Sequence, residues 1–188
     1  MDTIKTYENR NDIPECYKWD LDNLYESFDE YYKDRDRTTE IIEKIKKYEG
    51  KVLSSSRNLL DIEELELDLS LILDKMVNYI HLNSELDTRD GLFNSKMGEL
   101  TDFYSKMDLE LNFVSEELKS LTDEKLDEFI SLEPELKKYE FDLRRTIKNN
   151  KHLLSLECEN LLSTLSPVMG AGEEIFSKLD DADVDYGS

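Results

Sequence analysis

The chain is poor in the residues that interrupt helices or build reactive centres. It has three prolines and six glycines in 188 residues, and only two cysteines and two histidines. Few helix-breaking residues leave room for long uninterrupted helices. Cys16 and Cys158 form neither a disulfide framework nor a C-x-x-C pair, which favours a reducing compartment and predicts a cytoplasmic protein.

Long hydrophobic runs are also absent from the sequence. No stretch of roughly 18 apolar residues is present, so we expect no transmembrane helix. Residues 1–5 are polar and lack the apolar segment of a signal peptide, so we expect no secretion signal.

Positive charge is scarce. Lys and Arg number 24 against 45 Asp and Glu, which gives a formal net charge of −21. Nucleic-acid binding depends on Lys and Arg neutralising phosphates, and an anionic membrane repels the same surplus of carboxylates. We therefore expect neither nucleic acid nor membrane as a partner, and interpret the acidity as a solvated helix exterior.

The spacing of the large apolar residues predicts an all-α fold. They recur every three or four residues, and no alternating strand pattern is present. The two clearest stripes are Ile62, Leu65, Leu69, Ile72, Met76, Tyr79 and Leu86, then Phe93, Met97, Leu100, Tyr104, Met107, Leu111, Val114 and Leu118. Joined by a short connection, they predict a long antiparallel helical hairpin over about residues 59–118.

Capping residues predict the remaining boundaries, for six or seven helices and no sheet. Ser27 is expected to cap a helix that Gly50 ends in the left-handed conformation. Thr122 is expected to cap a helix over 123–131, and Pro134 to open the next at its first position. Ser155 is expected to cap the last helix.

The domain organisation follows from these elements. Residues 1–20 are predicted to be an N-terminal arm, and residues 21–182 a single helical domain. Residues 183–186 (Asp-Val-Asp-Tyr) alternate polar and apolar side chains as the beginning of a strand does, and 183–188 are interpreted as the start of a following domain. We therefore expect a further domain to follow in a longer protein.

The sequence contains no motif of a catalytic or metal centre: H-E-x-x-H, G-x-S-x-G and a phosphate-binding loop are all missing. His81 and Glu85 are four residues apart, but a zinc site needs three or four converging ligands. His152 and Cys158 share no evident geometry, and residues 170–172 (Gly-Ala-Gly) are interpreted as a helix kink. We predict no catalytic residue, no metal ligand and no cofactor in this chain.

A small basic island stands out in the acidic chain. Arg144 and Arg145 are followed by Lys148, Lys151 and His152. Arg144, Arg145 and His152 are candidates for contact with a peptide carboxylate or with an acidic surface of a neighbouring domain. The alternative is that the arginines form intramolecular ion pairs with the many carboxylates.

Several short motifs occur in a characteristic order. They are residues 17–21 (Tyr-Lys-Trp-Asp-Leu), 24–25 (Leu-Tyr) with Ser27, 48–52 (Tyr-Glu-Gly-Lys-Val), Tyr79 with Leu82 and Asp87, Leu136 and Tyr139 before Arg144 and Arg145, His152 with 154–155 (Leu-Ser), Glu159 with 161–162 (Leu-Leu), 176–179 (Phe-Ser-Lys-Leu) and 181–186 (Asp-Ala-Asp-Val-Asp-Tyr). Over roughly residues 10–186 their order and spacing resemble the N-terminal region of oligoendopeptidase F, a zinc metallopeptidase of the thimet-oligopeptidase class. Structural roles are assigned to Trp19, Tyr25, Gly50, Tyr79 and Ser155.

The resemblance implies a non-catalytic helical domain that forms one wall of a deep channel. Such a channel admits short peptides and excludes folded proteins. Zinc and its H-E-x-x-H motif are expected in a C-terminal catalytic domain, which is the expected partner. In isolation, the domain is expected to expose an apolar docking face and to self-associate. By the same resemblance, Arg145 is taken as an ion-pairing residue and His152 as a cap at a helix start.

A second function stays open at this point. The chain is also interpreted as a free-standing acidic helical-bundle adaptor that binds a protein partner along an exposed seam. This reading predicts a gene that stops near residue 188, whereas the peptidase reading predicts a gene that continues to an H-E-x-x-H helix.

Overall fold

The computed structural model describes residues 12–86 and 91–150, with the single residues 7, 165, 172 and 176. Within these residues all regular structure is helical, which confirms the predicted all-α class. The α-helices are α1 (Phe28–Ile45), α2 (Ser56–Leu86), α3 (Gly91–Leu118), α4 (Asp123–Leu132) and α5 (Glu140–Asn150), and the 3-10 helices are η2 (Glu15–Tyr17), η3 (Leu21–Asn23), η4 (Lys46–Tyr48) and η5 (Pro134–Lys138).

Five α-helices are thus found in the described residues, where six or seven were predicted for the whole chain. The helix expected after Ser155 lies outside the described residues. None of the described helices is both long and apolar enough to span a membrane. The chain divides into two units, Met1–Arg144 and Arg145–Ser188, and the architecture below is that of the first.

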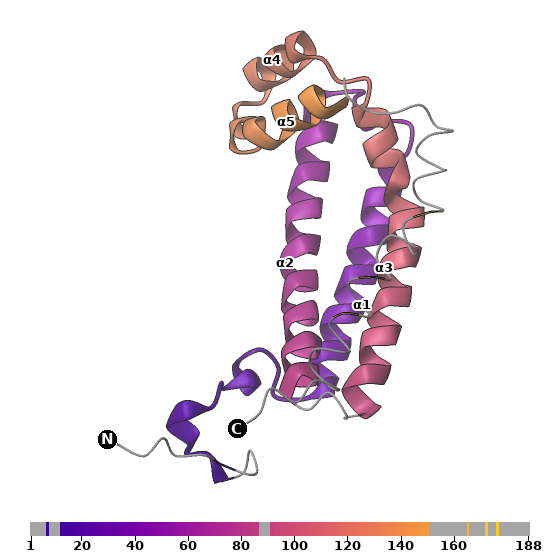
Figure 1. Ribbon diagram of the computed structural model, residues 1–188. Helices are drawn as coiled ribbons and strands as arrows, with labels where there is room; N and C mark the ends of the chain where they lie inside the picture. Colours follow the sequence, from indigo (N-terminus) through magenta and orange to yellow (C-terminus); the bar gives the residue numbers. More distant parts are fainter. Residues whose placement is uncertain are drawn as a thin grey trace. The chain divides into compact units, whose positions relative to one another are not determined.

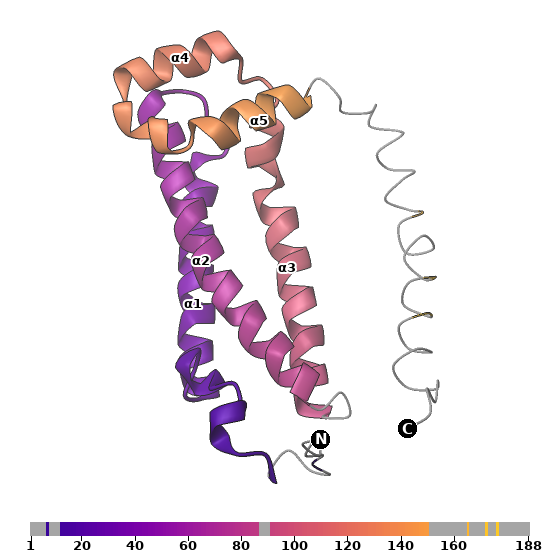
Figure 2. The same ribbon diagram turned by 60° about the vertical axis from the view of Figure 1, so that its left-hand side comes forward.

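Helices α1, α2 and α3 form an up-down-up bundle (Figures 1 and 2). α2 and α3 run antiparallel, as the two apolar stripes predicted, and α1 packs against both. α4 lies across the end of the bundle where α3 finishes. Three long helices can bury one apolar stripe each because each stripe faces the other two.

The core at the other end of the bundle is aromatic. Tyr25, Tyr31 and Tyr79 are buried, and Tyr25 meets the other two rings edge to face, with centroids 5.2 Å apart for Tyr25 and Tyr79. Phe28 and Phe93 complete the cluster from α1 and α3. Edge-to-face packing places the positive rim of one ring on the negative face of the next, so these rings stabilise the bundle beyond their buried area.

Polar contacts fix the connection between α1 and α2. Gly50 has a φ of 72°, the left-handed conformation predicted for it. The Glu117 carboxylate, at the end of α3, accepts hydrogen bonds from the backbone N–H of Gly50 at 2.6 Å and of Val52 at 3.0 Å. One α3 side chain therefore ties down the turn that joins the other two helices.

The predicted helix starts are met to different degrees. The Thr122 hydroxyl caps α4 by accepting from the backbone N–H of Lys125 at 3.2 Å. Ser27 has the extended conformation of a cap, but its side chain makes no capping hydrogen bond.

Pro134 opens a helix at its first position, as predicted, but the expected single α-helix is divided in two. The chain first forms the 3-10 helix η5 and then begins α5 at Glu140. The apolar pair Leu136 and Tyr139 is spaced by three residues, which matches one turn of a 3-10 helix as well as an α-helical face. The 3-10 turn buries Leu136 completely.

Candidate functional site

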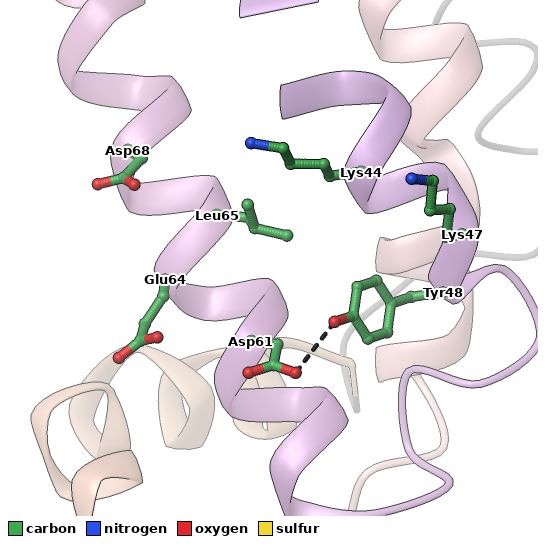
Figure 3. Close-up of a pocket in the computed structure, with 7 residues that line it drawn as sticks. All are labelled: Lys44, Lys47, Tyr48, Asp61, Glu64, Leu65 and Asp68. Carbon is green, nitrogen blue, oxygen red and sulfur yellow. Dashed lines mark hydrogen bonds between the residues drawn. The ribbon is translucent and has the colours of Figure 1, made fainter. Parts of the chain in front are cut away.

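A surface pocket of about 420 Å³ lies between the end of α1, η4 and the first half of α2 (Figure 3). It is lined by Lys44, Lys47, Tyr48, Asp61, Glu64, Leu65 and Asp68. The volume is within the range of about 300–1,000 Å³ that is usual for small-molecule sites. We call it the α1–α2 pocket.

Tyr48 and Asp61 form the ordered end of the pocket. The Tyr48 hydroxyl donates a hydrogen bond of 3.0 Å to Asp61 Oδ2, drawn in Figure 3, and Arg57 Nε lies 2.8 Å from Asp61 Oδ1. Burial and this hydrogen bond raise the pKa of the Tyr48 phenol. The Asp61 carboxylate is therefore engaged on both oxygens, and the Tyr48 ring is held in place.

The other charged groups that line the pocket form no ion pair within 4.0 Å in the described part of the chain. Lys44 and Lys47 have no carboxylate within 4.0 Å among the described residues, whereas the intervening Lys46 pairs with Glu43 at 2.8 Å and Glu110 at 3.0 Å. In Figure 3, Lys44 extends from α1 toward α2.

The α2 side of the pocket is acidic. Glu64 and Asp68 extend from α2, and Leu65 lies between them and Lys44 in the view of Figure 3. Neither carboxylate has an ion-pair partner in the stretches 12–86 and 91–150. The pocket thus presents separated positive and negative groups around an apolar centre, an arrangement suited to binding a ligand that carries both charges.

Arg144, a predicted contact residue, is engaged by three carboxylates. Its guanidinium bonds Asp123 at 3.0 Å, Glu140 at 3.0 Å and 2.9 Å, and Asp127. The hydrogen bonds to Asp127 and Glu140 raise the pKa of Arg144. Arg144 therefore links α4 to the beginning of α5 through intramolecular ion pairs, the alternative weighed above.

The other predicted contact residues are less defined. Arg145 is exposed on α5, and His152 lies outside the described residues, as does Ser155. His81 and Glu85 lie one turn apart on α2, with His81 Nδ1 3.8 Å from Glu85 Oε1, and both are exposed. In the part of the chain that the structure describes, no group of three or more His, Cys, Asp or Glu side chains is placed to hold a metal ion.

The residues given structural roles differ in environment. Tyr25 and Tyr79 are in the aromatic core, whereas Trp19 is 69% exposed. Trp19 borders a second surface pocket of about 400 Å³, lined by Glu15, Lys18, Trp19, Asp20, Leu21, Asp22, Asn83 and Leu86. Its indole is therefore a surface feature of the described structure.

Sequence reasoning missed the α1–α2 pocket and a pair of half-buried acids. Burial, then Glu66 and Asp142, raise the pKa of Glu63 from 4.5 to about 7, and burial raises the pKa of Glu66. In a chain with 45 acidic residues, no carboxylate is distinguished by its neighbours in sequence. The only available signal was that Glu63 and Glu66 flank the apolar stripe of α2.

Comparison with known proteins finds sequence similarity to oligopeptidases. Residues 117–186 match the sequence profile of the family described as Oligopeptidase F. The chain is 32% identical over 177 residues to group B oligopeptidase PepB of Streptococcus agalactiae, covering 94% of this chain and 30% of that protein. It is 26% identical over 180 residues to oligopeptidase PepF of Bacillus subtilis, covering 96% and 27%.

The fold is similar to that of a solved relative. The crystal structure of oligoendopeptidase-F from Enterococcus faecium superposes with a TM-score of 0.67 at 22% identity, over 86% of this chain and 32% of that one. The chain therefore spans about 30% of the length of the relatives it matches. These matches confirm the resemblance that the motif order predicted.

Proposed function

We propose, from the relationship of this chain to oligoendopeptidase F along nearly its whole length, that it is the non-catalytic N-terminal helical domain of a zinc-dependent oligoendopeptidase that cleaves short peptides. In this proposal the domain forms one wall of the substrate channel and limits substrate size. The observation that carries it is the match to oligopeptidases over 94% of this chain and 30% of the relative.

The dimensions of the bundle support the role of a wall. At 1.5 Å rise per residue, the 31 residues of α2 span about 46 Å and the 28 residues of α3 about 42 Å. An extended peptide advances about 3.3 Å per residue, so these helices flank roughly 13 residues of a substrate. The shared aromatic core and the Glu117 tie favour a rigid bundle.

The proposed zinc belongs to another part of the enzyme. The described residues do not fit a zinc site, because they bring no three ligands together. A bound zinc ion would activate water for peptide hydrolysis, and this chain would orient and sort peptides. The proposed partners are accordingly the catalytic domain and short peptides, in the cytoplasm.

A peptide-length series tests the size limit. The enzyme encoded by the whole gene is incubated with fluorogenic peptides of increasing length, a folded protein and the same protein unfolded. We expect cleavage of the short peptides and none of the folded protein, with the rate falling as the peptide outgrows the channel. Equal cleavage of long and short substrates would contradict a size-limiting wall.

The adaptor function is a second candidate because of one exposed seam. Leu67 and Leu71 lie one turn apart on α2 and are 47% and 61% exposed. Two exposed leucines on one helix face can pack against a partner helix as well as against a neighbouring domain. Partner capture that depends on these leucines, with no peptidase activity from the whole gene product, would favour the adaptor.

A further inference from the structure

We propose that the α1–α2 pocket is a binding site for a short zwitterionic peptide, with its C-terminal carboxylate at Lys44 and Lys47 and its ammonium at Glu64 and Asp68. That the ligand is a peptide rests on the proposed function; that it carries both charges rests on the pocket. In the proposed enzyme, the site would retain peptide near the channel wall.

The lysine side supplies the contact for a carboxylate. Lys44 and Lys47 are exposed, three residues apart at the end of one helical segment, and lack a carboxylate within 4.0 Å among the described residues. Residues spaced by three lie on the same helix face. Two ammonium groups that line one pocket can donate to a carboxylate bound there, and charge-assisted hydrogen bonds are stronger than neutral ones.

The centre of the pocket is apolar and fixed. Leu65 extends between the two helices, and the Tyr48 ring is held by its 3.0 Å hydrogen bond to Asp61. A fixed ring offers contact area to an apolar ligand side chain at little entropic cost. The centre therefore favours a peptide with an apolar residue over a small polar ion.

The acidic side selects against simple anions. Glu64 and Asp68 line the same pocket and repel acetate or phosphate, and the net charge of −21 adds to that repulsion. The ammonium group of a zwitterionic ligand is instead attracted to the carboxylates of Glu64 and Asp68. A volume of about 420 Å³ suits a di- or tripeptide.

Calorimetric titration of the 188-residue chain with the tripeptide Ala-Ala-Phe tests the site directly. We expect saturable one-to-one binding. The C-terminal amide and the N-acetyl form should each bind about fivefold more weakly, which is the upper end of what an exposed charge pair contributes. Inorganic phosphate, which carries the anionic charge alone, should not compete.

A matched pair of variants controls for net charge. The K44Q/K47Q variant should bind the tripeptide about fivefold more weakly, whereas K33Q/K106Q removes two other exposed lysines and should bind as the parent does. Lys33 lies eleven residues before Lys44, about 16 Å along α1. Circular dichroism checks that both variants keep their helix content.

Amide chemical shifts of the unsubstituted chain keep the test independent of the variants. Tripeptide-induced shifts should cluster at Lys44, Lys47 and Leu65. Absence of saturable binding at peptide concentrations on the order of 10 mM, equal binding of the amide, or shifts elsewhere would overturn the proposal. Such a failure leaves the channel-wall function standing, because that function is measured by cleavage.

Discussion

Replacing Glu63 by glutamine is expected to stabilise the fold at alkaline pH, although the substitution touches neither the aromatic core nor a helix cap. Glu63 is half-buried on α2, and burial, Glu66 and Asp142 raise its pKa from 4.5 to about 7. Its carboxyl thus holds a proton more tightly in the folded chain than in the unfolded chain.

The sign and size follow from the two pKa values. Below about pH 4.5 the carboxyl is protonated in both states and costs nothing. Above about pH 7 it is ionised in both, and the folded state bears the full cost of ionising it. The difference corresponds to at most about 3 kcal/mol, and partial solvation of the side chain reduces this to about 1–3 kcal/mol. The neutral glutamine removes that cost.

Urea unfolding between pH 4.5 and pH 8.5 measures the effect. We expect E63Q to raise the free energy of unfolding by about 1–3 kcal/mol at pH 8, with the gain falling toward zero near pH 4.5. E128Q, at an exposed position of α4, removes the same formal charge and controls for general repulsion in the acidic chain. If E63Q and E128Q gave the same pH dependence, the local environment of Glu63 would not be the cause.

Three further substitutions test separate contacts. Tyr25→Phe removes the 2.9 Å hydrogen bond to Asp34 from a residue that is 1% exposed. It should lower the free energy of unfolding, measured in urea titrations, by about 1 kcal/mol. An unchanged unfolding midpoint would refute this. Thr122→Ala removes the cap of α4 and should cost about 1 kcal/mol, whereas Thr122→Ser should be nearly neutral. Glu117→Gln weakens the tie to the 50–52 turn and should speed amide hydrogen exchange there; equal exchange rates would show that the turn holds without the tie.

The helices themselves were predictable because burial is periodic. The stripe from Ile62 to Leu86 and the stripe from Phe93 to Leu118 each mark one helix face, and the structure turns both inward except at Leu86, which is 38% exposed. The cap at Thr122 and the left-handed backbone conformation of Gly50 were also predictable, because each depends on only a few neighbouring residues.

Contacts between distant segments were not predictable in the same way. Glu117 meets the turn at Gly50 across 67 positions, and nothing near either residue marks the pair. The α1–α2 pocket depends on which turn of α1 faces Leu65, and the apolar pattern leaves that register open because several offsets bury similar side chains. Lys44 and Glu64 can be identified as residues of one pocket only once the register of α1 against α2 is known.

The measurement that bears most directly on the central claim is peptidase activity, compared between the pure 188-residue chain and the protein encoded by the whole gene. Both are assayed with a quenched fluorescent library of short peptides, with zinc added and then with a chelator. We predict an inert 188-residue chain and a longer protein whose activity the chelator abolishes. Chelator-sensitive cleavage by the 188-residue chain, or an inert product of the whole gene, would contradict the assignment as a non-catalytic peptidase domain.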